Sequence, residues 1–243
     1  MKNRGVVYIV FGEKYIKEAI LSASTVKKYS PNLHITFLCD QKIDSEFVDD
    51  FKKIKVNHIR PKVDYISFSP YDETLLLDSD TIVNYDITDI FDILKKYDLG
   101  ICHDLARKRT NVSTLIPPYN EIPYCFPEVN PGVFVFKKSE QVELFFKMWR
   151  SYFYKYHGVW PYEQPTFRVA LWESGVNFYI LPPEYNIRSK QNREKQHKFH
   201  QDFGSQHLKE RIFHMHHGKQ NVQDALNHCV KYLNHIFLIY QIY

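Results

Sequence analysis

The sequence has few cysteines, and they are scattered. Cys39, Cys102, Cys125 and Cys229 form no CxxC pair, which favours reduced thiols in a cytoplasm-like compartment over a disulfide framework. The start of the sequence does not favour a secretory leader, because only about six apolar residues precede Glu13 and a signal peptide needs a longer run. We therefore expect a cytoplasmic protein.

Long hydrophobic runs and a one-sided charge are absent as well. The apolar stretch at 233–243 is interrupted by polar residues and falls short of the roughly 20 residues that a membrane span requires, so a packed helix over 220–243 is expected instead. With 32 basic and 28 acidic side chains the net charge is +4, too balanced to indicate nucleic-acid binding yet compatible with a diphosphate ligand. Nothing in the composition indicates an oligomeric state.

The chain is rich in aromatic residues, at 16%, and it shows a regular alternation of strand and helix patterns. Continuous apolar runs predict strands buried on both faces, and apolar residues at helical spacing predict the helices between them. The predicted strands cover 5–11, 34–39, 56–59 and 74–77, and the predicted helices cover 16–27, 43–54 and 87–94. Such alternation is typical of a mostly parallel sheet with helices on both faces.

The second half has a less regular pattern. Five prolines within 111–131 predict a long loop, and the basic stretch 188–201 predicts another. Between them a strand is expected at 133–136, with helices starting at Ser139 and Pro165. No repeat or linker divides the chain, so we expect a single domain. Its expected parts are a nucleotide-binding half (1–104), a sugar-binding half (105–219) and a C-terminal helix (220–243).

Two carboxylates follow the 74–77 strand directly, at Asp78 and Asp80 on either side of Ser79. In an open parallel sheet, ligands bind at the carboxyl ends of the strands. Two acids this close repel each other unless a cation lies between them, and their oxygens suit Mg²⁺ or Mn²⁺ shared with ligand phosphates. The pair therefore predicts a metal-assisted diphosphate site. The alternative is a turn in which the aspartates have only a turn-forming role.

The same segment loosely resembles the first motif of haloacid-dehalogenase phosphatases, in which the first Asp is a nucleophile. Those enzymes normally carry that motif near the N-terminus and need a later acidic cluster for Mg²⁺. Here two strand–helix units precede the motif, and after Asp104 the only aspartates are the isolated Asp202 and Asp224. The phosphatase interpretation is therefore disfavoured.

A histidine-rich segment near the C-terminus offers further metal and phosphate ligands. A neutral imidazole from His214 or His216 can add a nitrogen to a metal held by carboxylates. Gly218 permits close backbone approach, and Lys219 can neutralise a phosphate. The alternative interpretation is a surface histidine cluster.

Amide and carboxylate side chains in the second half can serve a sugar. Asn130 precedes the 133–136 strand, and Glu163 and Gln164 stand at the start of the helix that Pro165 opens. Such groups hydrogen-bond sugar hydroxyls or stabilise a charged transition state, although loop amides and acids at helix starts are common for other reasons.

The order of these segments along residues 5–219 resembles the GT-A glycosyltransferases of the glycogenin and bacterial galactosyltransferase type (family 8). The resemblance implies an α/β fold, a single Rossmann-like GT-A domain with a mostly parallel central sheet flanked by helices. The ordered segments are Phe11-Gly12-x-x-Tyr15, Asp78-Ser79-Asp80, Asn130-x-Gly132-Val133, Glu163-Gln164-Pro165, Tyr185-Asn186-x-Arg188 and His214-x-His216-His217-Gly218-Lys219.

The resemblance also implies the cofactors. In that family the acids of the DxD motif and a C-terminal histidine hold Mn²⁺ on the diphosphate of UDP, so Asp78, Asp80 and one of His214 and His216 are the expected ligands of Mn²⁺ or Mg²⁺. The usual H-x-x-G spacing is not kept here, because the two histidines stand four and two residues before Gly218. His214 is slightly favoured, since it follows an Ile-Phe pair as in the family.

Other site residues follow from the same resemblance. Base and ribose contacts fall on the first strand and its loop, and Lys62, Ser79, Gly218 and Lys219 are expected near the phosphates. The residues in the base and ribose positions are Val10, Phe11, Gly12 and Tyr15.

Sugar contacts are expected from Asn130, from Glu163 in place of the usual Asp, from Gln164 and, less directly, from Asp104. Their assigned roles are catalytic.

The function implied is transfer of a hexose or related sugar from a nucleotide-diphosphate donor, UDP-linked, to a sugar or protein-linked acceptor, a glycan or glycoprotein, with retention of anomeric configuration. Two alternatives on the same scaffold remain. A nucleotidyltransferase would usually show a glycine-rich basic loop after the first strand, which Phe11-Gly12-Glu13-Lys14 is not. A non-catalytic nucleotide-sugar-binding protein is disfavoured by the intact DSD segment.

Overall fold

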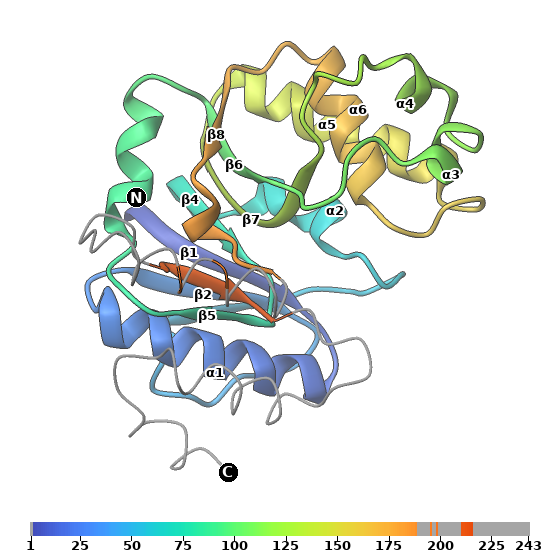
Figure 1. Ribbon diagram of the computed structural model, residues 1–243. Helices are drawn as coiled ribbons and strands as arrows, with labels where there is room; N and C mark the ends of the chain where they lie inside the picture. Colours follow the sequence, from blue (N-terminus) through green and yellow to red (C-terminus); the bar gives the residue numbers. More distant parts are fainter. Residues whose placement is uncertain (1, 189–194, 196–197, 199–209, 216–243) are drawn as a thin grey trace.

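The computed structural model of the protein describes residues 2–188, 195, 198 and 210–215. Seven strands form one sheet in the order β3-β2-β1-β4-β7-β6-β8, with helices on both faces (Figure 1). All neighbouring pairs are parallel except those that β7 makes with β4 and β6. The strands are β1 (Lys2–Val10), β2 (His34–Cys39), β3 (Asp50–Lys53), β4 (Tyr71–Leu77), β6 (Leu99–His103), β7 (Val129–Lys137) and β8 (Phe178–Leu181). The predicted mostly parallel α/β sheet is confirmed.

Alternate residues of the central strands enter two hydrophobic cores. Leu75 and Leu77 of β4 face the core that contains α1, whereas Leu76 faces the core that contains α5 and α6. Burial on both faces is what a continuous apolar run provides. The helices are α1 (Glu13–Tyr29), α2 (Lys62–Tyr65), η1 (Ile66–Phe68), η2 (Thr88–Lys95), α3 (Thr110–Ser113), α4 (Pro117–Glu121), α5 (Glu140–Tyr156), α6 (Gln164–Glu173) and η3 (Pro183–Tyr185), where η marks a 3-10 helix.

Local sequence signals set the ends of the long helices. The Ser139 side chain accepts a hydrogen bond from the Val142 N–H and caps α5. Gly12 caps α1 with a φ of 75°, a conformation that suits glycine, and its N–H donates to the Asp40 carboxylate. Gly175, with a φ of 67°, follows the end of α6. The helices predicted around these positions are confirmed.

Two predictions for the segment after β2 are wrong. The expected helix over 43–54 is absent; residues Asp50–Lys53 instead form the edge strand β3. β2 offers an open row of backbone groups, and the Ile35 carbonyl accepts a hydrogen bond from the Asp49 N–H before β3 begins. Tertiary pairing thus overrides the helical spacing of the apolar residues. The expected strand over 56–59 is also absent, and that stretch is irregular.

The proline-rich segment 111–131 is not the long loop that was expected. It contains α3 and α4, and Pro117 lies in the first turn of α4, where its missing N–H costs nothing. Apolar side chains of the two helices, including Val112 and Tyr119, form a small separate core with Val169 of α6. Their packing explains how so short a pair of helices is stabilised.

β7 begins earlier than predicted, so Asn130, Pro131 and Gly132 lie within the strand and not before it. Pro131 has no N–H to donate, and the pairing of β7 with β6 shifts register at this level, between Ile101 and His103. Proline in a strand is typically found at such irregularities.

A second, two-stranded sheet brings distant segments together. β5 (Thr81–Val83) pairs antiparallel with β9 (Ile212–His214), so that Thr81 lies opposite His214. In Figure 1, β9 (orange-red) lies beside β5, from which it is separated by about 130 residues in the sequence. None of the helices in the described part of the chain is both long and apolar enough to cross a membrane. The predicted helix over 220–243 lies outside the described residues.

Candidate active site

The two carboxylates predicted to bind metal lie where β4 ends. Leu77 is the last residue of β4, and the Asp78 N–H donates to the Gly132 carbonyl of β7 over 2.8 Å. Asp80 immediately precedes β5, and its carbonyl accepts from the Met215 N–H over 2.7 Å. Backbone hydrogen bonds to β7 and to the residue after β9 therefore hold the DSD segment on both sides.

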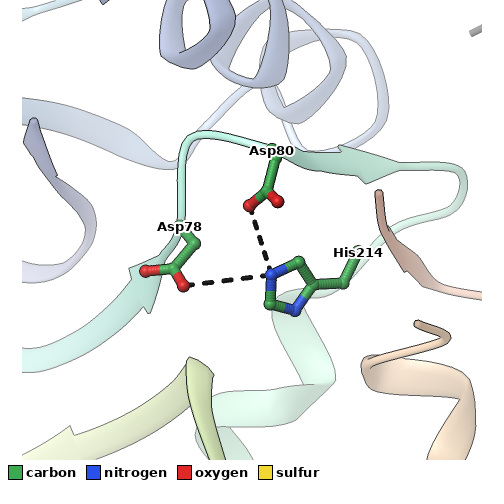
Figure 2. Close-up of side chains that lie close together, drawn as sticks. All are labelled: Asp78, Asp80 and His214. Carbon is green, nitrogen blue, oxygen red and sulfur yellow. Dashed lines mark ion pairs between the residues drawn. The ribbon is translucent and has the colours of Figure 1, made fainter. Parts of the chain in front are cut away.

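His214 completes a three-residue cluster with these acids (Figure 2). Its Nε2 lies 3.2 Å from Asp80 Oδ1 and 3.9 Å from Asp78 Oδ2. One ligand atom from each of the three residues lies within 4.8 Å of the others. Two carboxylate oxygens and one imidazole nitrogen that converge in this way fit a divalent cation such as Mn²⁺ or Mg²⁺.

The other nitrogen of the His214 ring is bound to a neighbouring amide. Nδ1 lies 2.9 Å from Asn186 Oδ1, and the Asn186 Nδ2 donates to Asn130 Oδ1 over 3.0 Å. All three side chains are buried. A histidine ligand whose second nitrogen is hydrogen-bonded is held in one ring orientation.

Gly132 leaves room for this cluster. A Cβ on Gly132 would overlap the His214 ring and lie 2.8 Å from Asp78 Oδ2 and 2.9 Å from Asn130 Oδ1. The Gly132 N–H also donates to Asn130 Oδ1. Only a glycine fits between the three side chains, which gives a steric reason for the N-x-G-V segment.

A buried ion-pair network connects Asp78 to Glu163. The Lys62 ammonium donates to Asp78 over 2.8 Å, lies 3.1 Å from Glu163 and also donates to the Pro131 carbonyl. Arg60 Nε lies 3.1 Å from the other Glu163 oxygen. Burial alone would raise the pKa of Glu163, but the charges of Lys62 and Arg60 lower it. The expected phosphate contact of Lys62 stays a prediction, because its ammonium is bound within the protein here.

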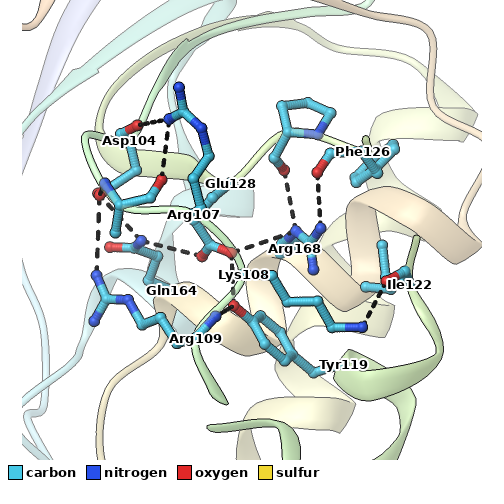
Figure 3. A network of polar contacts seen from close by, with 12 residues as sticks. Asp104, Arg107, Lys108, Arg109, Tyr119, Ile122, Phe126, Glu128, Gln164 and Arg168 are labelled. Atoms are coloured by element: carbon cyan, nitrogen blue, oxygen red, sulfur yellow. Dashed lines mark hydrogen bonds and ion pairs between the residues drawn. The ribbon is translucent and has the colours of Figure 1, made fainter. Parts of the chain in front are cut away.

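Gln164 links two further acids (Figure 3). Its Nε2 donates to Asp104 Oδ2 and to Glu128 Oε1, each over 3.2 Å. Arg188 also donates to Asp104, while the fully buried guanidinium of Arg168 lies 3.3 Å from Glu128. Both acids are buried, and arginines compensate their charges.

Burial raises the pKa of Glu128, against hydrogen bonds from Tyr119 and the charge of Arg168, which lower it. Tyr119 donates to Glu128 over 2.7 Å. Glu128 therefore has partners on two sides, and its second oxygen faces Gln164 at the edge of the site.

A cavity of about 870 Å³ is lined by the metal cluster, by the ion-pair network around Glu163 and by Gln164. Its volume is in the range of small-molecule sites. Predicted site residues that line it are Val10, Phe11, Tyr15, Lys62, Asp78, Ser79, Asp80, Asn130, Glu163, Gln164 and His214. Sequence segments about two hundred residues apart thus meet in one cavity.

The base and ribose candidates lie at one side of this cavity. Tyr15 has an exposed fraction of 47%, and its ring centroid lies 6.1 Å from that of Phe11. Glu18 of α1 lies nearby and accepts a hydrogen bond from Ser79. Gly12 does not line the cavity; it shapes the turn into α1.

Four further predicted site residues either do not line the cavity or lie outside the described residues. Asp104 lies behind the cavity wall and reaches it through Gln164 and Arg188. His216, Gly218 and Lys219 lie outside the described residues, so the choice of metal ligand is supported only for His214.

Sequence reasoning missed three groups. Arg60 and Glu18 line the cavity, and Glu128 lies behind Gln164; none belongs to a motif segment. Asn186 belongs to the segment Tyr185-Asn186-x-Arg188, for which the sequence predicts no individual roles. Its position in that segment is the one signal in the sequence that points to it.

Comparison with known proteins identifies relatives. A family model described as nucleotide-diphospho-sugar transferase matches residues 73–222, and no curated protein matches. The structure of the galactosyltransferase LgtC with donor and acceptor sugar analogues is similar with a TM-score of 0.62 at 14% identity, over 98% of this chain and 99% of that one. The expected GT-A glycosyltransferase fold is confirmed.

Two other solved structures share the fold. The glycosyltransferase GlyE of Streptococcus pneumoniae TIGR4 has a TM-score of 0.61 at 18% identity, over 94% of this chain and 60% of that one. Mouse xyloside xylosyltransferase 1 has a TM-score of 0.56 at 11% identity, over 87% of this chain and 97% of that one.

Proposed function

Because this chain belongs to the nucleotide-diphospho-sugar transferase family, we propose that it is a metal-dependent glycosyltransferase. It moves a hexose or related sugar from a UDP-linked donor to a sugar or protein-linked acceptor. LgtC, a galactosyltransferase whose structure contains donor and acceptor sugar analogues, supports the hexosyl type. The single observation that carries the proposal is the convergence of Asp78, Asp80 and His214 in the cavity.

These three residues would hold Mn²⁺ or Mg²⁺. An imidazole ligand favours Mn²⁺, because Mg²⁺ is bound mainly by oxygen. When bound, the ion would offset negative charge on the diphosphate as the sugar departs. The nucleotide would extend from the ion toward Phe11 and Tyr15 in the half formed by 1–104, and the sugars would occupy the half formed by 105–219.

Glu163 and Gln164, the side chains expected near the sugar, are poorly suited to act as nucleophiles. Both Glu163 oxygens are in ion pairs with Lys62 and Arg60, and Gln164 is an amide, a poor nucleophile. These contacts favour positioning roles over a covalent intermediate. We therefore propose that the acceptor oxygen bonds to the anomeric carbon as the bond to the diphosphate breaks on the same face. The acceptor proton passes to a diphosphate oxygen, and the configuration is retained.

The test is a donor panel. Purified protein is incubated with UDP- and GDP-sugars, with Mn²⁺ or Mg²⁺ and with chelator, while nucleotide release and thermal stabilisation are measured. Metal-dependent release from a UDP-sugar is expected, and the anomer of the new linkage, read by NMR, tests retention. The proposal would be refuted if no donor gave either turnover or a nucleotide-induced thermal shift. A thermal shift without turnover would instead favour a nucleotide-sugar-binding protein, and pyrophosphate release from a nucleoside triphosphate and a sugar phosphate would favour a nucleotidyltransferase.

A single substitution tests the metal cluster. Asp80→Asn removes one carboxylate ligand and keeps the size of the side chain. We expect Mn²⁺-dependent UDP binding, measured by calorimetry, to be lost while the circular dichroism spectrum stays that of the wild type. Unchanged affinity would show that the cluster does not hold the ion.

A further inference from the structure

The three amides that connect His214 to Asp104 and Glu128 form a chain with a defined direction. Gln164, Asn130 and Asn186, named here the amide relay, connect the acids shown in Figure 3 to the His214 ring. Each amide has one donating and one accepting end, so the direction of one link fixes the next.

The two buried acids, Asp104 and Glu128, determine which end of the first amide donates. Ionised carboxylates only accept hydrogen bonds, so Gln164 must present its NH₂ group to Asp104 and Glu128. Its oxygen then faces Asn130, whose Nδ2 donates over 3.5 Å, the longest link of the relay. The acids thus determine which end of the first amide faces the metal side.

A backbone group fixes Asn130 independently. The Gly132 N–H can only donate, and it donates to Asn130 Oδ1. The same oxygen accepts from Asn186 Nδ2, so Asn186 must present its own oxygen to His214 Nδ1. An oxygen at this position requires a proton on Nδ1, which leaves the Nε2 atom to face Asp78 and Asp80.

We propose that Asn186 is a positioning residue whose amide, oriented by the relay, holds His214 with Nδ1 protonated and Nε2 aimed at the metal position. The inference rests on the metal site of the proposed function, but not on transfer. Metal affinity then depends on groups buried away from the ion, and Glu128 at the far end is one of them. Outer-shell partners of this kind typically change metal affinity about 10–100-fold.

The main variant is Asn186→Leu, which keeps the size of the side chain and removes both hydrogen bonds. The dissociation constant of Mn²⁺ is measured by electron paramagnetic resonance without any nucleotide, and we expect it to rise about 10–100-fold. The matched control is Asn84→Leu. Asn84 is equally buried and follows β5, but lies outside the relay, so its variant should lose stability and bind Mn²⁺ like the wild type.

Unchanged Mn²⁺ affinity in Asn186→Leu, or an equal loss in Asn84→Leu, would overturn the inference. If the wild type binds no Mn²⁺, the proposed metal site itself fails, which is a distinct result. A double-mutant cycle of Asn186→Leu with Glu128→Gln tests the reach of the relay. We expect a coupling factor of about 2 or more in the Mn²⁺ dissociation constant, and simple multiplicativity would exclude Glu128.

The wild type alone provides a test if Asn186→Leu does not fold. In metal-free protein labelled with ¹⁵N at histidine, NMR at pH 8 reports which ring nitrogen of His214 carries a proton. We expect a protonated Nδ1. A neutral ring with the proton on Nε2 alone would contradict the relay direction and overturn the inference.

Discussion

Replacing Gly132 with alanine tests whether close packing, and not only ligand identity, forms the metal cluster. The added Cβ would overlap the His214 ring and approach Asp78 Oδ2 to 2.8 Å, whereas carbon and oxygen atoms normally keep more than 3 Å apart. His214 can move aside only by straining its hydrogen bond to Asn186 and its pairing with β5. β7 cannot move either, since it pairs with strands on both sides.

The clash has two measurable consequences. Overpacking in a buried site costs about 1–3 kcal/mol, which for a chain of this size corresponds to a fall of about 2–12 °C in Tm. A displacement of His214 by about 1 Å also spoils the ligand geometry, and such displacements cost about 100-fold in rate. We therefore expect weaker Mn²⁺ binding and a similar loss of transfer activity.

The assays are thermal unfolding and Mn²⁺ titration of Gly132→Ala beside two other glycine variants. Gly5→Ala would also clash, with the Tyr71 ring, but far from the cluster; it should lower Tm and leave Mn²⁺ affinity unchanged. Gly158→Ala meets nothing within 4 Å and should change neither. Wild-type Mn²⁺ affinity in Gly132→Ala would refute the packing argument.

Two further substitutions test the cavity walls. Tyr15→Ala removes a half-exposed ring; if that ring stacks on the base, the UDP dissociation constant measured by calorimetry should rise about 2- to 13-fold with Tm unchanged, and equal affinity would exclude stacking. Glu163→Gln leaves Lys62 and Arg60 without a shared counter-ion and should cost about 3 kcal/mol of unfolding free energy at pH 7. Since the pKa of Glu163 is lowered below its ordinary 4.5, this stabilisation is present above pH 4.5 and is lost as the pH falls through the lowered value; a difference from wild type that grows as the pH falls, measured by urea unfolding, would contradict the ion-pair assignment.

The sequence predicts the centre of the sheet and the position of the carboxylate pair at the end of a strand, for a local reason. Leu75, Leu76 and Leu77 are buried on both faces, so their pattern does not depend on distant partners, and the following Asp78 must lie at a strand end. The helix predicted over 43–54 failed because its apolar spacing is compatible with two structures. The open edge of β2 decided between them, and no local pattern reveals that edge.

The outer parts of the site depend on contacts between distant segments. Asn186 belongs to a recognised segment, yet its hydrogen bond to His214 exists only because β9 returns beside β5. Glu128 precedes the N-x-G-V segment and resembles any loop acid until Arg168 and Gln164 are placed next to it. Spacing along the chain shows neither relation, so only the structure identifies these two residues.

The short β5–β9 ladder also has a consequence for how the protein folds. It joins segments about 130 residues apart, and closing so long a loop carries a large entropic cost that three residues per strand can offset only in part. An ion shared by Asp80 and His214 would bind the closed form alone and so act as a cross-link at the end of that loop. Metal binding would then stabilise the pairing of β9 with β5, and the protein without metal should lose structure first at β9.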